Sequence, residues 1–215
     1  MSSRPDALLL IAPGCAHCPV VLQSLTEALK VGRLGRLEAV NIAAHPEVAK
    51  AVGARSVPWL RIGPFELEGL YTPIELAAWI EHAAQGTGWG QYFSSLLAQG
   101  RLAKTLKLVR EDATRLAQII ALAGSLETPM AARIGVGAVM EEFEGSNTLR
   151  HHIPGLVALT HSPEAQVRAD GCHYLALTNA GEVAEQVRPL LHDVNPEVRE
   201  IAYETLERLA GYHAS

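Results

Sequence analysis

Short apolar runs alternate with helix-like stretches along the first 84 residues of the chain. In the helix-like stretches the apolar residues recur every three or four positions, which is the period of an amphipathic helix, whereas the runs have the length of strands. Glycine, proline or small polar residues separate these segments, as expected of turns and helix ends. The pattern predicts strands at residues 7–12, 37–42, 59–62 and 65–68, and helices at residues 20–34, 47–52 and 73–83.

This order of elements predicts a mixed sheet. The first two strands must be parallel, because a helix connects them. The last two strands are joined by a short turn at Gly63-Pro64, which predicts an antiparallel hairpin. We therefore expect an α/β domain with helices on both faces of its sheet.

The second half of the chain has helical spacing throughout. Between the halves, the segment from Gln85 to Gly90 contains three glycines and predicts a linker or hinge. No later segment has a pattern typical of a strand. We therefore divide the chain into an α/β domain at residues 1–84, a linker with connecting helices or a partial first repeat at residues 85–112, and an all-α domain at residues 113–215.

Three helices of the all-α domain share one pattern near their starts. A polar residue, a proline and then an arginine occur at Thr128-Pro129 with Arg133, Ser162-Pro163 with Arg168, and Asn195-Pro196 with Arg199. We expect each polar residue to be an N-cap and each proline to be the first helical residue. Shorter apolar helices are expected before them, at residues 116–122, 153–159 and 183–191. Because the arginines are 35 and 31 residues apart, the pattern predicts an array of two-helix repeats.

Composition and charge narrow the class of protein. The chain is 48% apolar and 19% charged, as globular proteins are. Its formal net charge of −5 argues against a nucleic-acid partner. No apolar run has the length of a membrane span, and Met1 to Ala12 falls short of the apolar core of a signal peptide. We therefore expect a cytoplasmic protein with no membrane partner.

The strongest chemical signal is the segment Cys15-Ala16-His17-Cys18, which lies where the first strand turns into the first helix. A Cys-x-x-Cys pair at such a turn is typical of a redox site in a cytosolic protein. Free backbone N–H groups and the helix dipole lower the pKa of a thiol at a helix N-terminus. We therefore expect Cys15 at the helix N-terminus as the nucleophile and Cys18 one turn inside the helix. His17 would supply a further donor or positive charge.

Other interpretations of the cysteines remain open. A Cys-x-x-Cys pair can be half of a zinc site, although the chain has no second such pair. An iron–sulfur cluster shared between two copies is a further alternative. The third cysteine, Cys172, lies on the apolar face of a predicted helix, and we expect it to be a buried structural thiol. We favour the redox interpretation, which needs neither a metal nor a cofactor.

A second motif, Ser56-Val57-Pro58-Trp59-Leu60, leads into the third predicted strand. A proline that opens a strand is found at sheet edges or after a cis peptide bond. With this motif and the cysteine pair, residues 6–84 resemble a thioredoxin or glutaredoxin domain.

The resemblance implies a role for each residue of these two motifs. Cys15 would attack a disulfide and Cys18 would resolve the mixed disulfide. The backbone of Val57, before a cis Pro58, would pair with the substrate chain. Trp59 is a candidate for substrate contact, or else a core residue of its strand.

The chain also departs from thioredoxins, which carry a tryptophan just before the first cysteine and, six residues before that cysteine, a buried aspartate that accepts a proton from the second. Gly14 and Leu9 occupy these positions here. His17 and Val57 are instead similar to the site of oxidising proteins of the DsbA type. We therefore expect His17 or solvent to replace the missing carboxylate in proton transfer.

The all-α domain resembles HEAT repeats in the short form of the phycobilisome-lyase type, most closely from Asp193 to Leu209. This resemblance implies an extended surface that binds a protein partner.

Together these features predict a thiol–disulfide oxidoreductase that acts on disulfides or dithiols of a protein client docked by the helical repeats. The resemblance implies glutathione or a thioredoxin-reductase-type enzyme as a possible reductant. The alternative is a non-enzymatic adaptor or redox-sensing assembly factor, which Gly14 and Leu9 favour.

Overall fold

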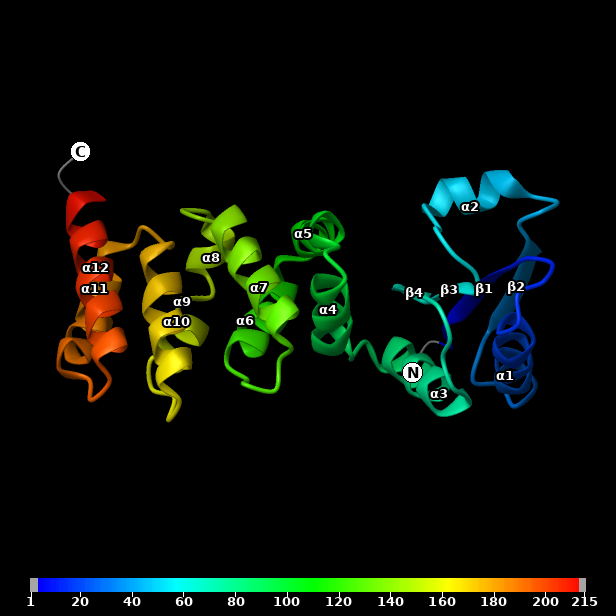
Figure 1. Ribbon diagram of the computed structural model, residues 1–215, viewed down its shortest axis with the longest axis horizontal. Helices are drawn as coiled ribbons and strands as arrows, with labels where there is room; N and C mark the ends of the chain where they lie inside the picture. The colour runs from blue at the N-terminus through cyan, green and yellow to red at the C-terminus, as the bar shows by residue number, and fades with distance from the viewer. Residues whose placement is uncertain (1–3, 213–215) are drawn as a thin grey trace. The chain divides into compact units, whose positions relative to one another are not determined.

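The computed structural model describes residues 4–212 of the chain (Figure 1). Residues 1–3 and 213–215, at the outer ends of the two expected domains, lie outside the described residues. The chain forms two compact units, which divide between Gly88 and Trp89. Within residues 4–212, no helix is both long enough and apolar enough to cross a membrane.

The first unit is a small mixed sheet with three helices, as the apolar pattern predicts. Its elements are β1 (Asp6–Ile11), α1 (Cys18–Lys30), β2 (Arg36–Asn41), α2 (Pro46–Val52), β3 (Trp59–Ile62), β4 (Phe65–Glu68) and α3 (Pro73–Gln85). The strand order is β2-β1-β3-β4. β1 is parallel to β2 and antiparallel to β3, and β3 and β4 form the expected hairpin.

The core of the first unit lies between the sheet and the pair α1 and α3. Figure 1 shows α1 and α3 on one side of the sheet and α2 on the other. Alternate strand residues, such as Leu9 and Leu60, are fully buried on the side of α1 and α3. There the ring of Phe65 lies 5.0 Å from the ring of Trp79 on α3. The period of two along each strand therefore decides which residues form this core.

The predicted bounds of the first helix are wrong by several residues. α1 begins at Cys18 and ends at Lys30, not at residues 20 and 34. It ends early because Gly32 has φ +72°, a left-handed conformation that favours glycine.

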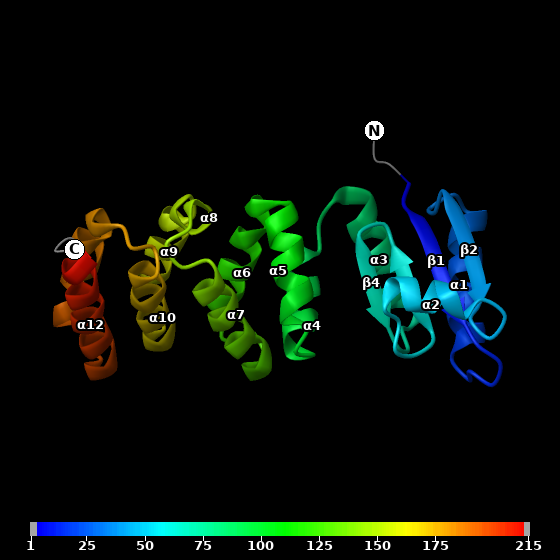
Figure 2. The ribbon, with the colours of Figure 1, turned by 90° about the horizontal axis from the view of Figure 1, so that it is seen from above.

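The second unit is helical throughout its described residues, and Figure 2 shows its helices following one another along the array. Its elements are α4 (Trp89–Ala98), α5 (Leu102–Glu111), η1 (Ala113–Arg115), α6 (Leu116–Ala123), α7 (Met130–Glu142), α8 (Asn147–Arg150), α9 (Ile153–Leu159), α10 (Ala165–Ala176), η2 (Gly181–Val183), α11 (Ala184–Val187), η3 (Arg188–His192) and α12 (Pro196–Tyr212). The helices α4 and α5 pack against α6 and α7, so they are part of this unit.

The structure corrects two local predictions for the second unit. Pro196 is the first residue of α12 as expected, but Pro129 and Pro163 lie before α7 and α10 rather than inside them. The predicted helix at residues 183–191 is broken into short turns of α- and 3₁₀-helix. Pro189 explains the break, since proline lacks an N–H and clashes with the carbonyl four residues earlier.

The three regularly spaced arginines make similar contacts in successive repeats. Arg133, Arg168 and Arg199 each donate to carbonyl oxygens of the loop before their own helix, at 2.8 to 3.4 Å. Arg133 also pairs with Asp170 at 2.5 Å, and Arg168 holds both oxygens of Asp193 at 2.7 and 2.8 Å. All three arginines therefore satisfy backbone carbonyls, and Arg133 and Arg168 also link α7 to α10 and α10 to the loop before α12.

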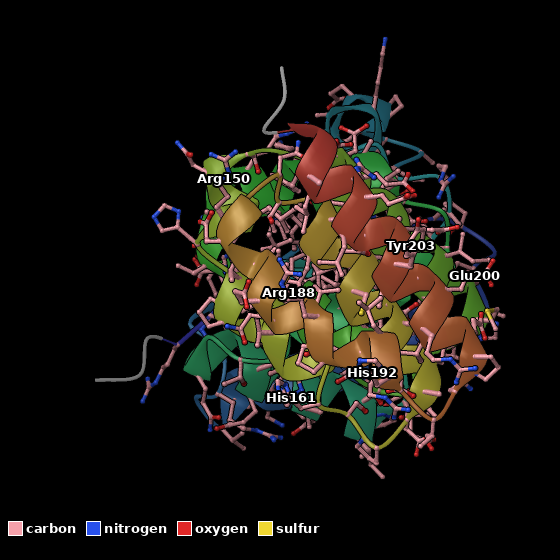
Figure 3. All side chains as sticks on the ribbon, turned by 90° about the vertical axis from the view of Figure 1, so that its left-hand side faces the viewer. Arg150, His161, Arg188, His192, Glu200 and Tyr203 are labelled. Carbon is pink, nitrogen blue, oxygen red and sulfur yellow. A yellow bond between two sulfur atoms is a disulfide. The ribbon has the colours of Figure 1, made fainter. Side chains whose placement is uncertain are left out.

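The last repeat presents a polar outer face (Figure 3). Arg188, His192, Glu200 and Tyr203 lie on this face and are exposed. Polar and charged side chains such as these are compatible with contact to water.

Candidate active site

Three loops leave the same end of the sheet in the first unit. The cysteine turn follows β1, the Val57–Pro58 segment precedes β3, and residues 69–72 follow β4. The strand ends are paired, Leu10 with Trp59 and Trp59 with Glu68. The sheet therefore brings together segments that lie far apart in the sequence.

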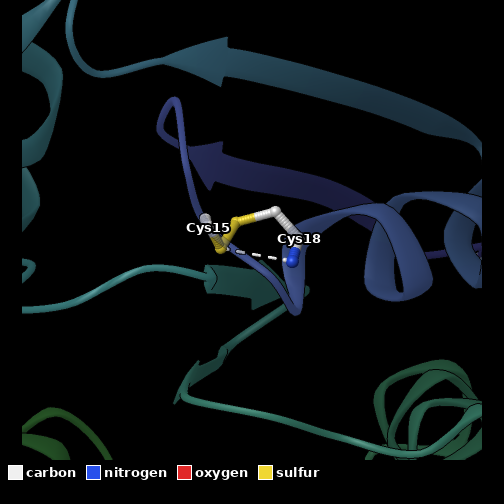
Figure 4. Close-up of a disulfide and its surroundings, with 2 residues drawn as sticks. All are labelled: Cys15 and Cys18. Carbon is white, nitrogen blue, oxygen red and sulfur yellow. Dashed lines mark hydrogen bonds between the residues drawn. A yellow bond between two sulfur atoms is a disulfide. The ribbon is translucent and has the colours of Figure 1, made fainter.

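The cysteine turn is closed by a disulfide between Cys15 and Cys18 (Figure 4). The S–S distance is 2.00 Å and the Cα atoms are 5.5 Å apart. Gly14, at φ +78°, lets the chain turn sharply after β1, and the Cys15 N–H donates to the Ala12 carbonyl at 3.3 Å. The two cysteines that the sequence singles out are therefore within bonding distance.

The two sulfur atoms have different surroundings. Cys18 is only 5% exposed, whereas Cys15 is partly exposed. The backbone N–H of Cys18 donates to Sγ of Cys15 at 3.2 Å (Figure 4). This N–H is one of the free donors of the first turn of α1, so it can stabilise negative charge on Cys15 when the disulfide is open. Cys15 is therefore the more exposed of the two cysteines, and a first-turn N–H lies against its sulfur atom.

No protein-family model matches the chain, and no curated protein matches it either. The fold and the site geometry are therefore the basis for assigning a function.

The helix does not begin where the sequence analysis places it relative to the cysteines. Cys15 precedes α1 by three residues, and Cys18, expected one turn inside, is its first residue. The expected stabilisation of a Cys15 thiolate does not depend on this difference, because a first-turn N–H still reaches Sγ of Cys15.

His17, Val57 and Pro58 occupy the sheet end that carries the disulfide. His17 is exposed directly before α1, and its side chain makes no capping hydrogen bond there. The Val57–Pro58 peptide bond is cis. The carbonyl of Pro58 accepts from the Gly69 N–H at 3.0 Å, which ties this segment to the loop after β4. The roles of His17 in proton transfer and of Val57 in substrate pairing remain predictions.

Trp59 is a buried strand residue, which is the second of its two predicted roles. Its side chain is fully buried, on the face of the sheet opposite α1 and α3. Trp59 directly follows Pro58, and the alternation of side chains along β3 places it on the face of the sheet that carries α2. Its indole Nε1 has no hydrogen-bond partner.

The third cysteine is a buried free thiol, as expected. Burial raises the pKa of Cys172 to about 11, with a further contribution from the nearby Asp193 carboxylate. A thiol with such a pKa is almost entirely protonated at neutral pH, so Cys172 is a poor nucleophile.

The loop after β4 ends in a closed helix cap. The Thr72 hydroxyl accepts from the Glu75 N–H at 3.2 Å, and the Glu75 carboxylate accepts from the Thr72 N–H at 2.7 Å. The Thr72 N–H and hydroxyl hold the pKa of Glu75 below its usual range. The start of α3 therefore carries its own negative charge.

Metal ligands do not gather near the cysteines. Among residues 4–212, no group of three or more His, Cys, Asp or Glu side chains is arranged to hold a metal ion.

Sequence reasoning missed three exposed apolar residues of the first unit. Val20, Leu70 and Ile74 are 45%, 54% and 82% exposed and lie within a few residues of the three converging loops. Val20 and Ile74 could have been noticed as apolar residues in the first turns of their helices. The sequence around each of these residues does not show that it lies near the converging loops.

Proposed function

We propose that this protein is a thiol–disulfide oxidoreductase that acts through Cys15 and Cys18. The observation that carries the proposal is the disulfide between an accessible Cys15 and a buried Cys18, with a first-turn N–H donating to Sγ of Cys15. A nucleophile needs both access and a stabilised thiolate, and a resolving thiol needs protection from other reactants.

In the reducing direction, the Cys15 thiolate attacks one sulfur of a client disulfide. A bond forms between Sγ of Cys15 and that sulfur, and the client's other sulfur leaves as a thiolate. The Cys18 thiolate then attacks Sγ of Cys15 and releases the second client thiolate. Two electrons pass from the dithiol to the client, and a dithiol or glutathione in the cell restores the reduced protein. The oxidising direction is the reverse.

The surrounding fold supports this chemistry. A sheet of order β2-β1-β3-β4, with the cysteines after β1 and a proline before β3, is the layout expected of a thioredoxin-like domain. In this proposal His17 assists proton transfer and the Val57 backbone aligns the client.

The helical unit would dock the protein client. Its paired helices, linked by arginines to the following repeat, have the organisation expected of HEAT-like repeats. Tethering a docking surface to a redox site raises the effective concentration of the client's sulfur atoms there. The cysteine pair would then react faster with a client bound by the helical unit than with other disulfide-containing proteins.

The first test is the redox equilibrium of the cysteine pair in the full-length protein. Glutathione buffers of graded potential are followed by alkylation, and the free thiols are counted by mass. We expect one reversible two-electron transition, which the Cys15→Ser variant lacks and the Cys172→Ser control retains. A wild-type protein with no reversible transition would overturn the proposal.

The client can be sought with a Cys18→Ser variant. Without the resolving thiol, the mixed disulfide between Cys15 and the client persists and can be isolated under non-reducing conditions. A Cys15→Ser variant is the matched control. If this control retains the same partner and its biological activity, the array acts as an adaptor rather than as a docking site for a redox client.

A further inference from the structure

We propose that one side of the helical unit, formed by α7, α10 and α12, binds a positively charged client segment that also carries an apolar anchor. This inference rests on the docking role in the proposed function and adds the chemistry of the client. It does not involve the cysteine pair, so it is tested separately from the redox chemistry.

The three helices lie along the same side of the second unit. Figure 2 shows α7, α10 and α12 in one row, with α6 and α9 in a second row. The ion pair of Arg133 with Asp170 joins α7 to α10, and α10 packs closely against α12. The outward faces of the three helices are therefore neighbours on one surface.

The apolar part of this surface lies on α7. Met130 and Ile134 are 72% and 70% exposed, and the partly exposed Ala138 follows at the same spacing of four residues. Residues four apart lie on one face of a helix, and the buried face of α7 is formed by others, such as Val136 and Val139. Because Met130 and Ile134 adjoin on the exposed face, they form an apolar patch rather than scattered single residues.

A groove between α10 and α12 forms the other part of the surface. Its volume is about 220 Å³, and it is lined by His173, Ala176, Ile201, Glu204, Thr205 and Arg208. Arg208 is paired with Glu144 at 2.6 Å, whereas Glu204 has no hydrogen-bond or ion-pair partner within residues 4–212. A lysine or arginine of a client can lay its apolar stem against Ile201 and pair its charge with Glu204.

The charges of these three helices are unbalanced. Their four arginines are all engaged within the fold, with carboxylates or with loop carbonyls: Arg133, Arg168, Arg199 and Arg208. The same helices contain no lysine. Four of their carboxylates have no hydrogen-bond or ion-pair partner in the part of the chain that the structure describes: Glu141, Glu197, Glu200 and Glu204. Figure 3 shows Glu200 at the outer edge of α12. The surface therefore carries unpaired negative charge.

This charge decides between possible occupants. A second copy of the chain would bring the same carboxylates to the interface, and an anionic membrane or nucleic acid would also be repelled. A basic polypeptide segment instead gains ion pairs on α12 and removes the apolar patch of α7 from water. Neighbouring helices pack about 8–10 Å apart, so α7 and α12 are about 20 Å apart, a span that an extended chain covers in about six residues.

The test measures the binding of fluorescent synthetic peptides to the full-length protein by anisotropy. The first peptide carries two leucines and two arginines, in either order, separated by about six neutral residues. Glutamates replace the arginines in a second peptide, and serines replace the leucines in a third. We expect the first peptide to bind at least about tenfold more tightly than the other two, and its binding to weaken as the salt concentration rises.

Matched substitutions locate the binding on this surface. Glu204→Lys should weaken binding of the first peptide about tenfold, because like charges then face each other. Glu182→Lys, at an exposed residue of η2, makes the same change of net charge elsewhere and should have little effect. Ile134→Ser should also weaken binding about tenfold, since it removes apolar surface. Its control is Val194→Ser, at a side chain that is 91% exposed in the loop before α12.

Several outcomes would overturn the inference. Equal weakening by Glu204→Lys and Glu182→Lys would show that net charge alone matters. Failure of the first peptide to bind, or equally tight binding of the glutamate peptide, would exclude a basic client segment. Self-association that Ile134→Ser abolishes would assign the surface to a second copy of the chain. The redox transition of Cys15 and Cys18 is measured on the same samples, and its absence would overturn the proposed redox function without changing the peptide result.

Discussion

The two units of this protein build their cores in opposite ways. In the first unit, β1 pairs with residues 36–41 on one side and residues 59–62 on the other, so the core joins distant parts of the chain. In the second unit the strongest packing joins nearby helices, such as α9 with α10 and α10 with α12. The core of the first unit joins β1, β3 and β4 with α1 and α3, whereas the core of the second unit is a series of neighbouring interfaces.

This difference explains where the candidate chemistry lies. A catalytic site needs several chemical groups close together. One end of the sheet provides this because three separate loops meet there. In the array, charged groups such as Arg133 with Asp170 and Arg168 with Asp193 serve to link successive repeats. We therefore predict that a destabilising substitution affects the whole core of the first unit, whereas in the second unit it affects mainly the neighbouring helices.

The largest expected effect tests the shared core. Phe65 is fully buried against Trp79, and Phe65→Ala should lower the free energy of unfolding of the first unit by about 3 to 5 kcal/mol. Because β1, β3 and β4 all contribute buried residues to the first unit, hydrogen–deuterium exchange should speed up in these three strands together. Faster exchange confined to β4 and α3 would show that the first unit is not a single cooperative body.

The next prediction concerns a close approach between neighbouring helices of the array. A Cβ atom on Gly171 would lie 2.9 Å from the Leu159 Cβ and 3.0 Å from the Thr160 backbone nitrogen. Gly171→Ala should therefore destabilise the second unit by about 2 to 3 kcal/mol, since backbone atoms cannot move aside cheaply. Exchange should speed up mainly in α9 and α10 and their direct neighbours.

Gly137→Ala is the matched control for this close approach. A Cβ there has only the Tyr174 hydroxyl nearby, at 4.0 Å, and alanine favours a helix over glycine by about 1 kcal/mol. We expect equal or slower exchange. A loss of stability as large as that from Gly171→Ala would contradict the packing explanation.

The smallest expected effect tests the link between repeats. Arg168 and Asp193 have side chains only 13% and 10% exposed, and Arg168→Gln should cost about 1.5 kcal/mol at neutral pH. Arg188→Gln is the control, since the ion pair of Arg188 with Glu185 is largely exposed and should be nearly neutral. Equal effects of the two substitutions would contradict a special role for Arg168.

The Arg168 effect should depend on pH. The Arg168 hydrogen bonds hold the pKa of Asp193 below its usual range in the folded state. The pair therefore contributes stability above the unfolded pKa of about 3.9, and this contribution is lost as the pH falls through the lower folded value. The difference between wild type and Arg168→Gln should shrink on acidification, as measured by exchange in α10. A difference that is constant from neutral to strongly acidic pH would show that the ion pair is not its cause.

Much of the fold could be predicted from the sequence because its signals are local. Alternating and helical periods placed every strand of the first unit to within one residue, and the glycine-rich segment from Gln85 marked the start of the change to helices. The regular spacing of Arg133, Arg168 and Arg199 indicated the repeats. Errors arose where one residue overrides a pattern, as with Gly32 at the end of α1 and Pro189 in the last repeat.

The candidate site could be predicted only in part from the sequence. Cys15 and Cys18 are close in sequence, so their motif could be recognised without a fold. The two possible roles of Trp59 could not be separated, because exposure depends on which face of the sheet a residue takes. The packing of α1 against α3 could not be predicted either, because it depends on the strand pairing between them.

The sequence by itself therefore determined the strands, most of the helices and the cysteine pair, since each depends on residues a few positions apart. Only the tertiary structure decided which of the two cysteines is more exposed and which carboxylates Arg133 and Arg168 pair with. These features depend on contacts between residues that the chain separates by tens of positions. Such contacts arise from the packing of side chains, which does not produce a periodic pattern in the sequence.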